Sequence, residues 1–200
     1  MKNVEFKTKR SGLLFIPVTK ENIILATETE MKFWPNNCAY NSYLRAYEKG
    51  KPYWLVYKNN EIVGLSGIYE SAELGEPETA WLGWFGVLED YRHLGYGSEI
   101  LEQTLEVARS QGFTKLRLYS SKRDDFCPNA LPFYKKLSAK YNGFVEDYTL
   151  EQLEMQRIVV SFSLNNKEIS KWNNRNLHLD DDRNENKDSL QNYLKEKSLL

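Results

Sequence analysis

"WFGVLEDYRHLGYGSEIL", residues 84–101, connects an almost wholly apolar run to a stretch with helical spacing through a loop that contains two glycines. The apolar run covers residues 79–88, which is typical of a strand covered on both faces. Because Gly95 and Gly97 have no Cβ, a bulky anion can approach the backbone there. The following helix adds a positive N-terminal end with unpaired amides. The stretch predicts a strand, a pyrophosphate-binding loop and a helix, although a tight turn alone would also explain both glycines.

The rest of the chain alternates apolar segments with turn signals as far as about residue 164. We expect strands at residues 13–18, 53–57, 61–69, 79–88, 115–120, 143–150 and 157–164. We expect helices at about residues 19–33, 37–49, 98–111 and 129–137, with Thr19 as the N-cap of the first. A helix between the strands at 79–88 and 115–120 implies a parallel crossover. This order predicts a mixed α/β fold.

The composition limits the number of domains. Two hundred residues with 41% hydrophobic content suffice for one good core with an appendage. We expect a domain at residues 1–164 and a polar tail at residues 165–200, because the sequence after 164 is rich in Asn and in charges of both signs. Within that tail, Leu190, Tyr193 and Leu194 fall on one helical stripe, so a short helix is an alternative to a loose end.

Charge and residue usage argue against several classes of partner. The formal net charge is −1 and no cluster of five or more Lys and Arg is found, so we expect neither nucleic-acid nor membrane binding. The two cysteines and two histidines have no metal-ligand spacing, so we expect no metal site. The apolar run at 13–18 is too short for a signal sequence or a membrane span. These features predict a cytoplasmic protein.

Two motifs resemble those of a known family. Residues 84–101 resemble the acetyl-CoA-binding motif of the GNAT superfamily of N-acetyltransferases, with its [R/Q]-x-x-G-x-[G/A] loop, and "AWLGWFGV" at 80–87 resembles bacterial members. "NALPFYKKLSAKYNGF", residues 129–144, is similar to the family's Asn, Phe-Tyr and closing Gly-Phe stretch. The close likeness covers residues 80–148. It implies a strongly twisted mixed sheet with helices on both faces, acetyl-CoA as co-substrate, and acetylation of a primary amine.

The resemblance also implies how acetyl-CoA is held. In this family the pantetheine arm lies along the fourth strand like an added strand, so the backbone of Phe85 and Val87 would pair with it. The amide near Phe85 would face the thioester carbonyl and stabilise the oxyanion. For Asn129, a helix N-cap is an alternative to contact with the arm. The implied cofactor-binding residues are Phe85, Gly86, Val87, Arg92, His93, Leu94, Gly95, Tyr96, Gly97, Ser98 and Asn129.

The catalytic acid and base are a separate question. Tyr134 matches the family's tyrosine, whose protonated phenol can donate to the departing thiolate, although a core aromatic is the alternative. The fourth strand holds no carboxylate, so Glu78 just before it and Glu70 at the end of the preceding strand are the candidate bases, with Glu30 as a third. For each of these carboxylates, a solvated surface position is the alternative.

We interpret the chain as an enzyme in which a small-molecule amine or a peptide amine attacks acetyl-CoA directly in a ternary complex. No Cys or Ser has a plausible nucleophile setting. The main alternative is a non-catalytic acyl-CoA sensor or interaction module, and a nucleotide-binding protein is a more distant one. A homodimer is left open. The acceptor pocket could be shaped by Trp34, Trp81 and Trp84, which could equally belong to the core.

Overall fold

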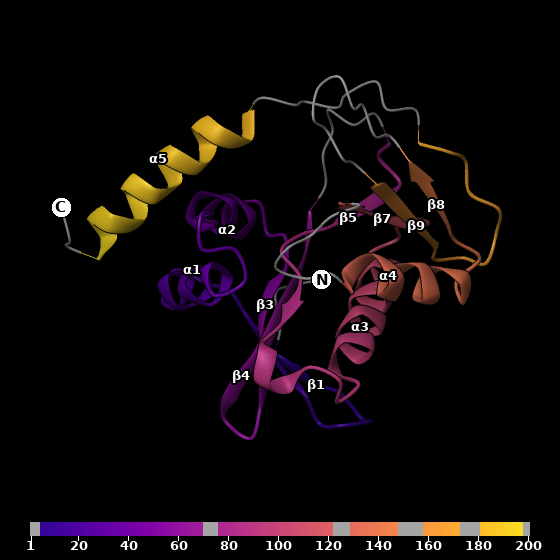
Figure 1. The fold of residues 1–200 in the computed structure, drawn as a ribbon, viewed down its shortest axis with the longest axis horizontal. Coiled ribbons are helices and arrows are strands. Elements are labelled where there is room, and N and C mark those ends of the chain that lie inside the picture. Colours follow the sequence, from indigo (N-terminus) through magenta and orange to yellow (C-terminus); the bar gives the residue numbers. More distant parts are fainter. Residues whose placement is uncertain (1–4, 70–75, 122–128, 148–157, 173–180, 198–200) are drawn as a thin grey trace. The chain divides into compact units, whose positions relative to one another are not determined.

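The computed structural model describes residues 5–69, 76–121, 129–147, 158–172 and 181–197 (Figure 1). The chain forms two compact units. The first comprises Met1–Tyr69, Gly83–Gln103 and Leu177–Leu200. The second comprises Glu70–Leu82 and Thr104–Asn176. The expected α/β class is confirmed, because strands and helices alternate along the described residues.

The first unit contains an antiparallel sheet. In the order of pairing its strands are β1 (Phe6–Lys7), β2 (Leu14–Pro17), β3 (Tyr53–Lys58), β4 (Glu61–Tyr69) and β6 (Gly86–Val87). Strands β3 and β4, both expected from the sequence, form a hairpin: Asn59 and Asn60 have φ of 51° and 68°, as in a two-residue turn that suits strand twist. The short strand β1 was not expected from the sequence.

Helices α1 (Ile23–Met31) and α2 (Tyr40–Glu48) lie on one side of this sheet, and the first half of α3 (Tyr96–Ser110) lies on the other (Figure 1). The expected start of the first helix at Thr19 is wrong, because the Asn22 side chain accepts a hydrogen bond from the Thr19 amide at 2.7 Å and donates one to the Pro17 carbonyl at 2.9 Å. These bonds close a turn, and the helix begins only at Ile23.

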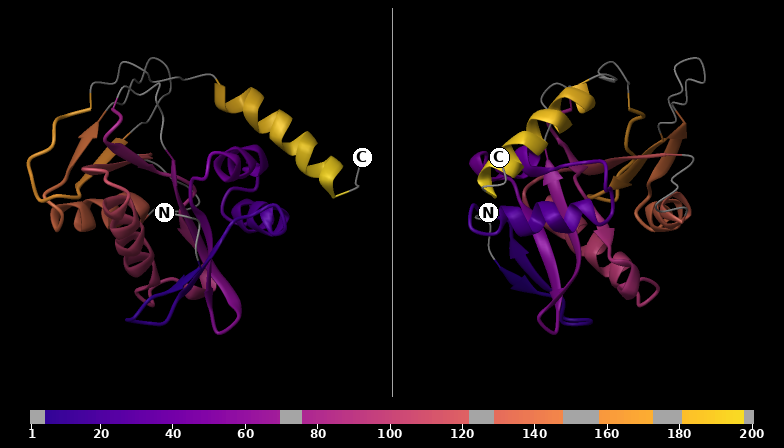
Figure 2. Two further views of the ribbon diagram at one scale, coloured as in Figure 1. Left: turned by 180° about the vertical axis from the view of Figure 1, so that it is seen from behind. Right: turned by 60° about the vertical axis from the view of Figure 1, so that its left-hand side comes forward.

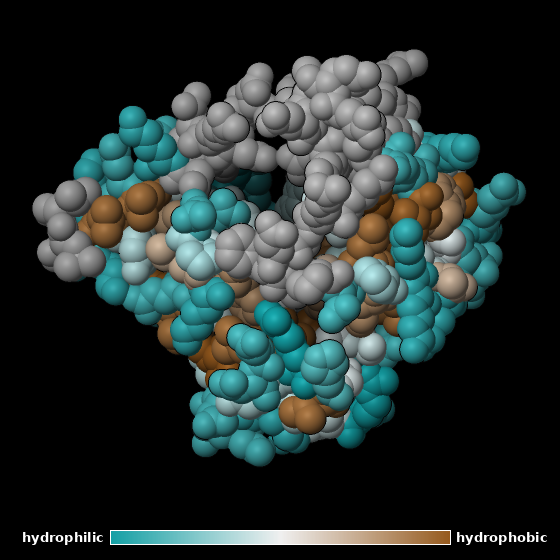
Figure 3. All heavy atoms as spheres, viewed as in Figure 1, coloured by the Kyte–Doolittle hydropathy of each residue, from teal (hydrophilic) through white to brown (hydrophobic). Residues whose placement is uncertain are grey.

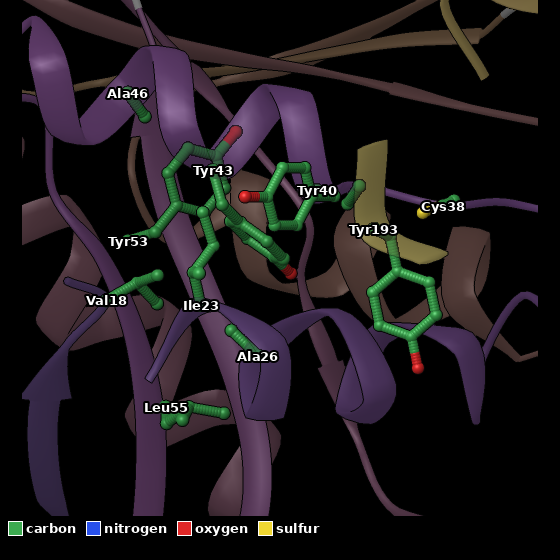
Figure 4. Packing of buried hydrophobic residues seen from close by; sticks show 11 residues of the cluster. Val18, Ile23, Ala26, Cys38, Tyr40, Tyr43, Ala46, Tyr53, Leu55 and Tyr193 are labelled. Atoms are coloured by element: carbon green, nitrogen blue, oxygen red, sulfur yellow. The ribbon is translucent and has the colours of Figure 1, made fainter. Parts of the chain in front are cut away.

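Buried tyrosines contribute to the core between these helices and the sheet. The rings of Tyr43 and Tyr53 meet edge to face, with centroids 5.1 Å apart (Figure 4). Helix α5 (Asp181–Glu196) lies beside α2 and adds Tyr193 to the same core (Figures 2 and 4). The helix that the sequence allowed near its end is therefore present, and it begins seven residues before Asp188.

The second unit contains a mixed sheet. Its strands pair in the order β5 (Thr79–Leu82), β7 (Lys115–Ser120), β9 (Ile158–Ser163) and β8 (Phe144–Asp147), and α4 (Ala130–Ala139) packs on β8 and β9. The predicted parallel pairing is confirmed between β5 and β7, and the other pairs are antiparallel. Residues 148–150 of the expected strand 143–150 lie outside the described residues.

The expected continuous strand at residues 79–88 is wrong. Thr79–Leu82 pairs with β7, whereas Gly86–Val87 pairs with β4, and residues 83–85 between them are not in a strand. Residues 83–85, where the break lies, include no polar residue or proline to reveal it. The physical reason lies in Gly83, where a Cβ would stand 2.0 Å from the Tyr53 hydroxyl oxygen, so the chain passes this ring with no side chain of its own.

Residues beyond 164 take part in the second unit. Trp172 is buried, and its ring centroid lies 5.6 Å from that of Trp81 and 5.5 Å from that of Tyr119. The Ser170 carbonyl accepts a hydrogen bond from the buried Arg117 guanidinium at 2.8 Å, and the Glu146 carboxylate accepts one from the Trp172 amide at 3.1 Å. Residues 165–172 of the expected tail thus contribute packing and hydrogen bonds to this sheet.

Candidate functional site

Strand β6 leads through a short turn into the glycine loop, and all of these residues belong to the first unit. Gly86 lies opposite Leu65 in β4, and the Leu88 amide donates to the Val63 carbonyl at 2.9 Å. A 3-10 turn at Glu89–Tyr91 then redirects the chain. The residues expected to pair with the pantetheine arm and the expected phosphate loop therefore lie in one continuous segment, which is hydrogen-bonded to β4 at its start.

The loop itself contains two residues in the left-handed region. His93 has φ of 63° and Gly95 has φ of 83°. This backbone conformation favours glycine, which is the residue found at position 95. The Glu99 amide donates to the Gly95 carbonyl at 3.2 Å, so α3 begins at Tyr96, two residues before the expected start. The amides of the first helical residues have no acceptor within their own helix. Together with the helix dipole, they form an arrangement that suits an anion such as a pyrophosphate.

The Arg92 side chain is anchored at the end of β6. Its Nε donates a hydrogen bond to the Val87 carbonyl at 3.1 Å, and the residue is half-buried. This bond holds a positive charge beside the loop and ties the loop to the strand that precedes it. Its role in reinforcing a pyrophosphate remains a prediction.

A carboxylate in the first turn of α3 is neutralised by a segment remote in sequence. Glu99 is buried, and it accepts hydrogen bonds from the Ser11 hydroxyl at 2.6 Å, the Ser11 amide at 3.1 Å and the Arg10 Nε at 3.2 Å. Burial raises the pKa of Glu99, but the bonds from Ser11, Thr8 and Arg10 outweigh it and the pKa is lowered overall. The pairing offsets a charge that would oppose an anion at this helix end. No sequence signal links residues 88 positions apart.

Tyr134 and Asn129 belong to the second unit. Tyr134 lies on α4 with 8% of its surface exposed. Asn129 is exposed and occupies the N-cap position of α4, but its side chain makes no capping hydrogen bond. The structure leaves the contact of Asn129 with acetyl-CoA and the acid role of Tyr134 as predictions.

The candidate bases differ in their surroundings. Glu70 lies outside the described residues. Glu78 accepts a hydrogen bond from Lys115, whose Nζ lies 2.9 Å from its carboxylate, and this bond is the main reason that the pKa of Glu78 is lowered. A lowered pKa makes this carboxylate a weaker proton acceptor.

Glu30, the third candidate, is fully buried at the end of α1. Its Oε2 accepts the Ala39 amide at 3.2 Å, while its Oε1 has no hydrogen-bond partner among the described residues. Burial raises the pKa of Glu30 to about 8, against the lowering effect of the Ala39 amide. Such a carboxyl group can take up or release a proton near neutral pH.

The three tryptophans named above separate into two groups. Trp34 and Trp84 are partly exposed in the first unit, with ring centroids 5.2 Å apart. Trp81 is buried in the second unit and stacks on Tyr119 with centroids 4.6 Å apart, so it belongs to the core. Trp34 and Trp84 therefore fit the expected wall of an acceptor pocket better than Trp81.

Within the described part of the chain, no group of three or more His, Cys, Asp and Glu side chains could hold a metal ion. None of the helices described there is long and apolar enough to cross a membrane.

Comparison with known proteins agrees with this fold. The family model described as "Acetyltransferase (GNAT) family" matches residues 22–138. A GNAT-family acetyltransferase from Staphylococcus aureus is 15% identical, with a TM-score of 0.57 over 76% of this chain and 99% of that one. Arabidopsis thaliana Naa50, in complex with the bisubstrate analogue CoA-Ac-MVNAL, is 22% identical, with a TM-score of 0.60 over 76% and 98%.

A third solved structure, the Escherichia coli ribosomal-protein-S18-alanine N-acetyltransferase, is 12% identical, with a TM-score of 0.53 over 80% of this chain and 97% of that one. No curated protein sequence gives a significant match. At these identities, the solved structures establish the likeness of the fold, and the family model establishes the family.

The raised pKa of Glu30 predicts a pH dependence of stability. Because the pKa is higher in the folded protein than in the unfolded chain, the folded state keeps a proton that the unfolded state releases. This contribution to the free energy of unfolding is complete below the unfolded pKa, about 4.3, and is lost as the pH rises through about 8. Glu30→Gln, which cannot ionise, should therefore gain stability relative to the wild type between pH 5 and pH 8.

Urea denaturation at several pH values measures this difference. Glu48→Gln, an exposed substitution on α2, is the matched control and should show a constant offset from the wild type. An offset for Glu30→Gln that does not change with pH would contradict the assignment.

Proposed function

The chain belongs to the acetyltransferase (GNAT) family, and from this premise we propose that it transfers the acetyl group of acetyl-CoA to a primary amine of a small molecule or a peptide. One observation carries the proposal. Strand β6, the loop at residues 92–95 and the first turn of α3 are continuous, and they combine a half-buried strand segment with a helix end suited to a pyrophosphate. This arrangement supports acetyl-CoA as the co-substrate.

In the proposed complex the pantetheine arm pairs with the backbone of Phe85 and Val87, and the loop amides hold the pyrophosphate. The amide near Phe85 faces the thioester carbonyl, where preorganised donors stabilise the developing negative charge by about 3 kcal/mol each in other acyl-transfer sites. Arg92, held by the Val87 carbonyl, adds positive charge beside the phosphates.

The proposed chemistry is a direct transfer. The neutral amine nitrogen attacks the thioester carbon and forms the C–N bond. The C–S bond then breaks as the departing thiolate takes a proton from the Tyr134 hydroxyl, and the positively charged nitrogen releases its extra proton, which returns the Tyr134 phenolate to its neutral form. An ammonium acceptor must first lose a proton. Ionised Glu30, with its raised pKa of about 8, binds a proton more strongly than Glu78, which is paired with Lys115, and the ionised fraction of Glu30 grows as the pH approaches 8. Because Glu30 is buried, this proton transfer would run through water.

The alternative functions that the sequence allowed have less support. The family description names acetyltransferases, and no observation supports the non-catalytic sensor. A cytoplasmic location and a homodimer remain predictions from the sequence, as do the expected absences of nucleic-acid and membrane partners.

Mass spectrometry of an amine panel tests the proposed function directly. The protein is incubated with acetyl-CoA and separate pools of polyamines, amino acids and short peptides. We expect at least one pool to gain the mass of an acetyl group, with release of an equal amount of free thiol. Tight acetyl-CoA binding without acetylation of any pool would favour the sensor instead.

Tyr134→Phe tests the proposed acid. The substitution keeps the buried ring and removes only the hydroxyl, so acetyl-CoA affinity and stability should change little. Turnover with a competent amine should fall by about 10²- to 10⁴-fold, the usual range for one acid–base group. Tyr141→Phe, which removes a hydroxyl just after α4, is the control. Turnover that is unchanged in Tyr134→Phe would make Tyr134 a packing residue.

A further inference from the structure

Helix α5 lies outside the segment that matches the family model, which ends at residue 138. The solved structures cited above are matched over nearly their whole length, yet they account for only 76–80% of this chain. The sequence of α5 is mostly hydrophilic, and the hydrophobic residues on the face seen in Figure 3 lie near its C-terminal end. So polar a helix has little apolar surface with which to dock. Its attachment to the rest of the first unit therefore depends more on polar contacts.

The most buried of these contacts is made by Ser189, which is 1% exposed. Its hydroxyl oxygen accepts a hydrogen bond from the Asn41 amide at 2.9 Å and lies 3.7 Å from the Cys38 sulfur. The first amides of α2 have no acceptor within their own helix, and the N-cap residue Ala39 has no side chain that could supply one. Ser189 supplies it from 148 positions away.

Further bonds attach α5 to α1 and α2. Tyr193 donates its hydroxyl to the Glu28 carboxylate at 3.3 Å, and Lys197 forms an ion pair with the same carboxylate. The Asn192 side chain donates to the Asn41 side chain at 3.0 Å. Helix α5 thus contacts both α1 and α2. Residues 32–39, which join these two helices, are called the α1–α2 connection below.

The α1–α2 connection contacts the segment that enters β6. A Cβ at Gly86 would lie 2.7 Å from the Phe33 ring, so this ring packs directly on the strand backbone. The neighbouring Trp34 ring meets that of Trp84. At its far end, the connection is fixed by the bond from the Ala39 amide to Glu30 and by the contacts of Ser189.

We propose that Ser189 is a positioning residue for the acceptor amine: by capping α2 it holds the α1–α2 connection, with Phe33 and Trp34, against the acyl end of the transfer site. This proposal rests on the proposed function, because that function places the acetyl group beside Phe85. The pyrophosphate of acetyl-CoA is assigned to residues 92–98, and not to the part of the site that the α1–α2 connection contacts. Loosening the connection should therefore weaken the binding of the amine much more than that of acetyl-CoA.

Steady-state kinetics of Ser189→Ala test the proposal, with a competent amine from the panel. Loss of one buried hydrogen bond should raise the KM for the amine roughly five- to tenfold, with the KM for acetyl-CoA changed by less than about twofold. Gln191→Ala, an exposed substitution on the same helix, should leave both values unchanged. Equal rises in both KM values, or an unchanged KM for the amine, would overturn the proposal.

Trypsin cleavage gives an independent measurement, because the exposed Lys32 begins the α1–α2 connection. Cleavage after Lys32 should be faster in Ser189→Ala than in the wild type and in Gln191→Ala. If Ser189→Ala does not fold, Asn192→Ala, which removes an exposed bond to Asn41, takes its place in both measurements. If the wild type acetylates no amine, the proposed function fails. If cleavage at Lys32 is unchanged in Ser189→Ala, α5 does not hold the α1–α2 connection, whatever the outcome for the proposed function.

Discussion

The passage of the chain past the Tyr53 ring at Gly83 is the constraint on which the candidate site depends. Leu82 ends the strand that pairs with β7, and Gly86 begins the strand that pairs with β4, so one apolar run supplies a strand to each unit. A side chain at Gly83 would displace the Tyr53 hydroxyl, which a Cβ would approach to 2.0 Å. Strand β6 leads into the glycine loop, and the glycine loop in turn sets the residue at which α3 begins.

Local sequence was sufficient to predict the elements around the loop. Gly95 has the left-handed φ that the loop requires, and Gly112, with φ of 91°, ends α3 where the sequence indicates. The parallel pairing of β5 with β7 followed from the helix between them. These features depend on neighbours within one turn or one crossover, so spacing and residue type reveal them.

Other features depend on contacts between residues far apart in sequence, which a pattern cannot show. The break in the apolar run depends on Tyr53, and the burial of Trp172 depends on Trp81. The sequence placed Glu78 ahead of Glu30 as a candidate base, yet Lys115 lowers the pKa of Glu78 while burial raises that of Glu30. The docking of α5 likewise depends on Ser189 meeting an amide of α2.

Hydrogen–deuterium exchange with and without saturating acetyl-CoA tests the proposed acetyl-CoA site, because it reports on the backbone amides assigned to the co-substrate. We expect slower exchange in peptides that cover Phe85–Val87 and Arg92–Ser98. Peptides from α5 should change little. Unchanged exchange at residues 85–98 in a protein that binds acetyl-CoA, with protection concentrated in other segments, would contradict the assignment of the site.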